Sequence, residues 1–292
     1  MLVIRRNNQS NKLDPNKTQI WLGAAERGCK VVSEFQLKRD IIEVGRRIYN
    51  SGFVAANDGN ISIRVNDNLV LTTPTGVSKG FLTQDMIVTV DMDGKVISGN
   101  WRPSSELKMH LAVYRAREDI KSVVHAHPPY ATAFAVAGFA LEKPIMPEVV
   151  INLGWVPLTQ YGTPSTEEIP EAILPYLPCH DAFLLQNHGA LTVGTDVYNA
   201  LFKMETLEMG AKISLFARLL GGEREISPEN VERLLEVRRN LGMTGSHPAL
   251  CDLPEANNVA AAQPPGGDRV DETELKRIIT EVVKQVLAEQ RG

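Results

Sequence analysis

The feature that most constrains this chain is an apolar run that ends in two histidines, Val-Val-His-Ala-His at residues 123–127. Such a run is typical of a buried β-strand, in which side chains i and i+2 point to the same side. His125 and His127 would therefore face one spot, which His188 could reach from the end of a second strand. Three imidazoles leave a coordination position open, as in a catalytic zinc site. On the His-x-His motif alone, ordinary strand histidines bonded to the backbone are an equal alternative.

Composition excludes several classes of protein. The 292 residues carry a formal net charge of −4 and 6% aromatic residues, with no basic stripe that would predict a nucleic-acid partner. No apolar run has the length of a membrane span, and residues 1–15 lack the apolar centre of a signal peptide, so we expect a cytoplasmic protein. Cys29, Cys179 and Cys251 are far apart and odd in number, which indicates reduced thiols.

Hydrophobic periodicity predicts an α/β domain. The helical patterns cover about 34–50, the segment from Ser105 to about 117, 130–136, 197–220, and 227–240 with a serine cap. The strand patterns cover 61–65, 69–72, 86–91, 95–98, a segment ending at 127, 183–186 and 191–193. The hairpin signal Asp93-Gly94 favours antiparallel pairing over a parallel nucleotide-binding sheet.

Composition divides the chain into an N-terminal extension (1–33), a folded domain (34–252), a flexible linker (253–269) and a final helix (270–292). The linker is rich in Ala, Asn, Pro and Gly. In the final helix, apolar residues repeat at helical spacing: Leu275, Ile278, Ile279, Val282, Val283, Val286 and Leu287. An isolated helix of this length is marginal in water, so the stripe needs a partner. The helix either packs on its own domain or a neighbouring subunit, or docks on another protein.

Five short polar clusters indicate a functional site. They are Asn57-Asp-Gly-Asn60, Thr73-Pro-Thr-Gly76, Ser104-Ser-Glu106, His125-Ala-His127 and Asn187-His-Gly189. Each one alone is more often a plain turn or helix start. Together they fit an anion site, because glycine lets backbone N–H groups approach a phosphate and Ser, Thr and Asn supply neutral donors. Ser104 and Ser105 also precede a helix, whose N-terminus attracts anions.

The sequence resembles the class II aldolase/adducin family over roughly residues 34–242. The matching stretches are NDGNISIR, LTTPTG, SSELKMH, VVHAH, YGTPST and LLQNHGAL. The resemblance implies a three-layer α/β/α fold with a mixed, largely antiparallel central sheet, and a homotetramer with active sites between subunits. It implies a Zn²⁺ site of His125, His127 and His188, with Glu106 moving between metal and substrate as acid and base. The implied phosphate pocket consists of Asn57, Gly59, Asn60, Thr75, Gly76, Ser104 and Ser105.

The implied activity is zinc-dependent cleavage of a ketose 1-phosphate, such as L-fuculose or L-rhamnulose 1-phosphate, to dihydroxyacetone phosphate and an aldehyde such as lactaldehyde. Alternatives within the family are a pentulose-phosphate 4-epimerase or a sugar-phosphate dehydratase, and a third is an adducin-like binding protein without catalysis. Family epimerases carry Asp at the position of Glu106, so Glu here favours an aldolase. The complete set of three histidines and Glu106 argues against the binding protein.

Two expectations concern the periphery of the site. Family aldolases use a tyrosine from the neighbouring subunit as proton donor, but this chain has Glu148 near that position. The donor could therefore be Glu148, Tyr130, Tyr161 or water, while His110 is interpreted as structural. The final helix resembles the encapsulation peptides of bacterial microcompartments, which implies a shell-protein partner and a location in the compartment lumen.

Overall fold

The computed structural model describes residues 33–251, 277, 280 and 281. The predicted extension up to residue 32, the linker 253–269 and the apolar stripe of the final helix lie outside the described residues. Arg277, Thr280 and Glu281, within that final segment, have helical backbone. No helix in the described part of the chain is long and apolar enough to cross a membrane.

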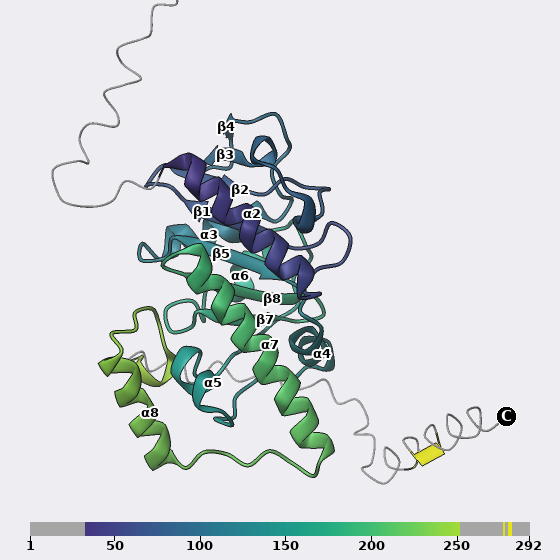
Figure 1. The fold of residues 1–292 in the computed structure, drawn as a ribbon, viewed down its shortest axis with the longest axis vertical. Coiled ribbons are helices and arrows are strands. Elements are labelled where there is room, and N and C mark those ends of the chain that lie inside the picture. Colours follow the sequence, from purple (N-terminus) through teal and green to yellow (C-terminus); the bar gives the residue numbers. More distant parts are fainter. Residues whose placement is uncertain (1–32, 252–276, 278–279, 282–292) are drawn as a thin grey trace, which may run out of the picture.

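Eight strands form one sheet in the order β4-β3-β2-β1-β5-β8-β7-β6 (Figure 1). Their bounds are β1 Asn60–Arg64, β2 Leu69–Thr72, β3 Val88–Asp91, β4 Val96–Ser98, β5 Ser122–Ala126, β6 Leu158–Thr159, β7 Ala182–Leu185 and β8 Gly189–Gly194. All neighbouring strands pair antiparallel except β6 and β7, which are parallel. The prediction of a mixed, largely antiparallel sheet is confirmed.

Helices cover the two faces of this sheet. Figure 1 shows α2 and α7 in front of the strands, and α3 and α6 behind them. The helix bounds are α2 Glu34–Asn50, α3 Leu107–Ala116, α4 Pro129–Ala137, α5 Pro147–Asn152, α6 Glu168–Ile173, α7 Val197–Leu219 and α8 Pro228–Asn240, with short 3-10 turns η3 Lys79–Phe81, η4 Gln84–Met86 and η5 Pro248–Leu250. The fold is therefore the predicted three-layer α/β/α arrangement.

Two apolar clusters separate the layers, and the period of two along the strands explains them. In β5, Val124 joins the cluster with α2, α4 and α7, whereas its neighbour Val123 joins the cluster with α3 and α6. Ala190 and Leu191 of β8 divide in the same way. Successive side chains on a strand point to opposite faces, so a strand covered on both sides is apolar throughout.

The long helices begin where the sequence supplies a cap. The side chain of Ser227 accepts a hydrogen bond from the Asn230 amide at the start of α8, as predicted, and Ser33 does the same for Gln36 at the start of α2. The sequence did not predict α5, α6 or β6. These elements span six, six and two residues, which is too short to show a period.

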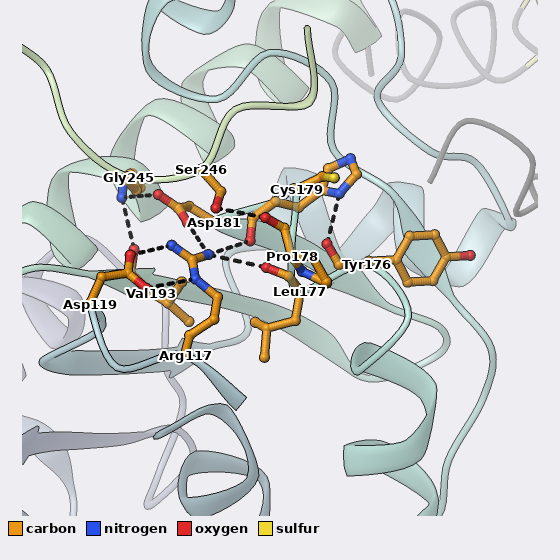
Figure 2. A network of polar contacts seen from close by, with 12 residues as sticks. Arg117, Asp119, Tyr176, Leu177, Pro178, Cys179, Asp181, Val193, Gly245 and Ser246 are labelled. Carbon is orange, nitrogen blue, oxygen red and sulfur yellow. Dashed lines mark hydrogen bonds and ion pairs between the residues drawn. The ribbon is translucent and has the colours of Figure 1, made fainter. Parts of the chain in front are cut away.

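A buried ionic network ties the end of the described domain to its sheet (Figure 2). The Asp181 carboxylate, 3% exposed, accepts hydrogen bonds from Arg117 Nη1 at 2.6 Å and Lys203 Nζ at 2.7 Å. Beside it, Ser246 Oγ donates to the Pro178 carbonyl. A side chain at Gly245 would collide with the Asp181 carboxylate, since its Cβ would lie 2.4 Å from Oδ2.

The expectation of reduced thiols is wrong for two of the three cysteines. Cys179 and Cys251 are joined in a disulfide, with their Cα atoms 5.5 Å apart. They are 72 residues apart in the sequence, and only folding brings them together, so the sequence did not predict this pair. Cys29 lies outside the described residues.

We predict that Asp181→Ala lowers the free energy of unfolding by about 3–5 kcal/mol, because it leaves two buried cations without their shared carboxylate. Asp119→Ala is the matched control, since Asp119 pairs with the same Arg117 but its side chain is 52% exposed. That control should cost less than about 1 kcal/mol. Urea denaturation measures both, and equal losses would contradict the assignment.

Candidate active site

The five segments that carry the polar clusters meet at one edge of the sheet. Because β5 is antiparallel to both β1 and β8, the end of β5 lies beside the starts of those two strands. Asn60 is paired with His125, and Ala126 with Ala190. The end of β2 reaches the same edge, and backbone hydrogen bonds from Thr75 to Arg102 and from Ser104 to Thr73 bring in the Ser104-Ser105 segment. Antiparallel pairing thus gathers all five polar clusters of the sequence.

The three predicted histidines converge at this edge. His125 is fully buried at the end of β5. His127 lies one residue beyond the strand, and its backbone N–H donates a hydrogen bond to the Phe53 carbonyl at 2.8 Å. The Nε2 atoms of His125 and His127 lie 3.2 Å apart. His188 follows β7, and its ring centroid is 4.7 Å from that of His125. One ligand atom from each ring lies within 4.8 Å of the other two.

Hydrogen bonding and burial prepare these rings to donate lone pairs. His125 Nδ1 lies 2.9 Å from the Ala190 carbonyl, which can only accept, so Nδ1 carries the proton and Nε2 is free. Burial holds the pKa of His125 well below its usual value and also lowers the pKa of His188. Both rings are therefore neutral at pH 7, the form that binds a metal. Asp58 lies behind His127, with Oδ2 3.7 Å from Nδ1.

Two glycines and one asparagine in the motifs are explained by this packing. A Cβ on Gly189 would lie 2.5 Å from His127 Cδ2, so only glycine fits beside that ring. Gly59 has φ +73°, and a Cβ there would lie 2.9 Å from the His125 carbonyl. Asn187 adopts φ +53° in the tight turn that presents His188, a conformation that asparagine tolerates better than most residues.

Glu106 faces the histidines from the start of α3. Its Oε2 is 3.3 Å from His125 Nε2, and its Oε1 is 3.3 Å from His188 Nε2. Asn60 Nδ2 donates to Oε2 at 2.8 Å, whereas Oε1 is buried without a hydrogen-bond partner among the described atoms. The carboxylate is thus fixed by one oxygen and free to act with the other.

A chain of hydrogen bonds behind Glu106 fixes the Asn60 amide. Since the Asn60 amide nitrogen serves Glu106, its oxygen must accept from His110 Nε2. His110 Nδ1 then accepts from Ser62 Oγ at 2.6 Å, and Ser62 accepts from the Tyr114 hydroxyl at 2.8 Å. Burial lowers the pKa of His110 to about 3, so the ring stays neutral. The geometry is consistent with the structural role predicted for His110.

A cavity of about 220 Å³ opens beside the histidines. All seven residues predicted for the phosphate pocket line it: Asn57, Gly59, Asn60, Thr75, Gly76, Ser104 and Ser105. Asp58, Pro74, Lys79 and Pro164 line it as well and were not predicted. Asp58 and Pro164 lie inside the motifs NDGN and YGTPST, which could have identified them. Lys79 follows LTTPTG by three residues and carries no motif of its own.

The three side chains considered as proton donors are not among the described residues that line the cavity. Glu148 is exposed at the start of α5, and the Tyr161 side chain is 56% exposed. Tyr130 lies in α4, where its amide donates to Glu208. The identity of the proton donor therefore stays a prediction.

The residues present fit a bound metal ion. Three imidazoles and one carboxylate converge, and the buried Glu106 Oε1 has no hydrogen-bond donor. Unprotonated nitrogens and an anionic oxygen that face one another repel unless a cation lies among them. Imidazole nitrogens and a carboxylate oxygen form a donor set that would suit zinc.

Comparisons with known proteins agree with this geometry. The family model for the Class II Aldolase and Adducin N-terminal domain matches residues 39–215. The chain is 36% identical over 175 residues to an L-fuculose phosphate aldolase of Methanococcus maripaludis, covering 60% of this chain and 94% of that protein. It is 34% identical over 187 residues to a 3-oxo-tetronate 4-phosphate decarboxylase of Haemophilus influenzae, covering 62% and 88% respectively. A solved structure of L-fuculose 1-phosphate aldolase aligns with a TM-score of 0.66 at 28% identity, covering 72% of this chain and 100% of that one.

We predict that His127→Ala lowers zinc affinity by more than about 100-fold, since even an outer-shell partner of a metal ligand contributes 10–100-fold. His125→Ala and His188→Ala should behave alike. Glu106→Gln should keep the metal and lose most turnover, because the amide cannot accept a proton. Metal analysis after dialysis measures the first effect. Full zinc occupancy in His127→Ala would contradict the assignment.

Proposed function

Because the chain belongs to the class II aldolase and adducin family, we propose that it is a zinc-dependent lyase that cleaves a ketose 1-phosphate to dihydroxyacetone phosphate and an aldehyde. The observation that carries this proposal is the position of Glu106 between three converging imidazoles and a cavity lined by neutral phosphate donors. L-Fuculose 1-phosphate and L-rhamnulose 1-phosphate are the substrates we favour, with lactaldehyde as the second product.

The chain's own residues bind the substrate and move its proton. The phosphate would lie among the backbone and hydroxyl donors of Thr75, Gly76 and Ser104, with the sugar directed toward the histidines. Glu106 Oε1 would take the proton from the hydroxyl β to the ketone. The electron pair left on that hydroxyl oxygen forms the aldehyde carbonyl, the adjacent C–C bond breaks, and the electrons of that bond form an enediolate. Glu106 would return the proton to the enediolate carbon, which gives dihydroxyacetone phosphate. A bound zinc ion would stabilise the developing negative charge as a Lewis acid.

A decarboxylase is the second candidate, favoured by the 34% identity to a 3-oxo-tetronate 4-phosphate decarboxylase. Aldol cleavage and decarboxylation would form the same enediolate intermediate. Loss of carbon dioxide from a 3-oxo acid with a 2-hydroxyl and a 4-phosphate leaves the same enediolate of dihydroxyacetone phosphate as aldol cleavage does. The phosphate pocket and the metal centre therefore suit both reactions, and the departing fragment distinguishes them.

The test is a substrate screen on the zinc-loaded protein. Fuculose, rhamnulose and ribulose phosphates and 3-oxo-tetronate 4-phosphate are offered, and released dihydroxyacetone phosphate is measured together with aldehyde or carbon dioxide. We expect dihydroxyacetone phosphate with an aldehyde from a ketose 1-phosphate. Glu106→Gln is the control and should release little. Carbon dioxide from the acid alone would favour the decarboxylase, and epimerised or dehydrated products would favour the other family activities.

We further propose a cytoplasmic homotetramer with active sites between subunits. Phe202, Met209 and Phe216 lie seven residues apart along α7, and each is about half exposed (52%, 51% and 47%). An apolar row of this kind on a helix fits a subunit interface. Light scattering should give a mass near four times 32.2 kDa, and a stable monomer would contradict the proposal.

We propose that the segment after residue 252 is a linker followed by a helix, and that this helix docks the enzyme inside a bacterial microcompartment. The amphipathic sequence pattern supports helix-in-groove binding to a shell protein. A fluorescent protein fused to residues 254–292 should co-purify with shell proteins. A control carrying Ile279→Glu and Val283→Glu should not. Equal association of both fusions would contradict the docking role, as would loss of zinc binding on deleting this segment from the full chain.

A further inference from the structure

Lys79 lines the candidate phosphate cavity and is almost completely buried, at 1% exposure. Its Nζ donates to the Asn57 carbonyl at 2.9 Å and to the Val77 carbonyl at 2.7 Å. These two carbonyls belong to the two turns that supply most of the pocket, the one at Asn57–Asn60 and the one that follows β2. One ammonium group thus joins both turns and retains a third N–H.

Packing of the surrounding backbone against α2 fixes the position of the Lys79 ammonium group. Lys79 begins η3, which packs against α2. A Cβ on Gly45 of α2 would lie 2.7 Å from the Lys79 carbonyl, and a Cβ on Gly80 would lie 2.5 Å from the Tyr49 ring. Both glycines allow a close approach that a larger residue would prevent, so the backbone that carries Lys79 is held firmly.

The Lys79 charge has no counter-ion of its own among the described residues. No carboxylate there forms an ion pair with Nζ within 4.0 Å, although Asp58 and Glu106 attract it from farther away. Burial outweighs that attraction and lowers the pKa of Lys79 to about 8. A buried cation that is not neutralised is costly, and such groups in a cleft are candidates for function.

We propose that Lys79 is the cationic anchor of the phosphate subsite, where the substrate phosphate supplies the missing counter-ion and accepts the third N–H. The inference rests on the proposed function, which places a phosphate in this cavity. Among the described residues that line the cavity, Lys79 is the only lysine or arginine, while Asp58 and Glu106 carry negative charge. Lys79 therefore favours the entry of a dianion, because the other proposed phosphate donors are neutral. Lysine binds phosphate as a compact point charge.

The test compares Lys79→Met with Lys95→Met in the zinc-loaded full chain. Lys95 is exposed near the β3–β4 hairpin, so its replacement removes the same charge far from the cavity. For Lys79→Met we expect KM for the phosphorylated ketose to rise about 10–100-fold, the loss of one charge-assisted contact. The turnover number should change much less. The same sugar without phosphate should be cleaved as slowly by the variant as by the wild type.

Binding of inorganic phosphate, measured by competition with the substrate, should weaken by a similar factor in Lys79→Met and not in Lys95→Met. Lys79→Arg should recover part of the phosphate affinity, because it restores the charge. Equal loss on the phosphorylated and unphosphorylated sugars would show a merely structural role and overturn the proposal. If Lys79→Met does not fold, Lys79→Gln and Lys79→Arg decide, since only the charged variant should retain phosphate binding.

Failure of the proposed function gives a different result. If the wild type cleaves no ketose phosphate, calorimetry with inorganic phosphate still compares the variants. Weaker binding in Lys79→Met would support the anchor in the absence of that activity. Unchanged binding in Lys79→Met would overturn the anchor whatever the activity.

Discussion

The candidate site depends on the antiparallel pairing of β5 with β1 and β8. In a parallel arrangement the end of one strand lies beside the end of the next, and the starts of β1 and β8 would lie at the opposite edge of the sheet from His127. Antiparallel pairing instead sets Asn60 opposite His125 and Gly189 next to the His127 ring. Residues separated by more than 120 positions in the sequence thus meet at one edge. The helical layers on both faces hold this edge rigid, because the central strands are buried throughout.

Backbone strain is concentrated around the same edge. Three non-glycine residues among those described have positive φ, namely Ala56, Ser165 and Asn187. Ala56 precedes Asn57, Ser165 follows Pro164, and Asn187 precedes His188, so each is next to a residue that lines the cavity. Such conformations cost on the order of 1–3 kcal/mol each and persist where the surrounding structure enforces them. The positions of the proposed phosphate donors and of the third histidine are therefore maintained at the expense of stability, as expected for a preorganised site.

Much of the fold and of the candidate site could be predicted from the sequence, for identifiable physical reasons. The apolar run before His125, the helical spacing of apolar residues over 34–50 and the cap Ser227 act locally, so the strand and the two helices could be predicted. The seven pocket residues were identified through short motifs. Lys79 was missed because its role comes from two carbonyl contacts, one of them 22 residues away in the sequence. The bond between Cys179 and Cys251 was missed for the same reason, since distance along the chain says nothing of proximity in space.

The proposed substrate has a phosphate half and a departing half. A single chain could bind the first, whereas residues of a second chain could be needed for the other. The phosphate half would be enclosed by residues of a single chain, namely those that line the cavity from Asn57 to Ser105, Lys79 among them. Aldol cleavage and decarboxylation both leave the enediolate of dihydroxyacetone phosphate there, so this half does not select between them. Selection must come from the departing half. Glu148 and Tyr161, the candidate groups for that half, are exposed and do not line the cavity of their own chain. In the proposed tetramer the choice of reaction would therefore depend on the subunit interface, while the fold of each chain would supply the proposed metal site and phosphate pocket.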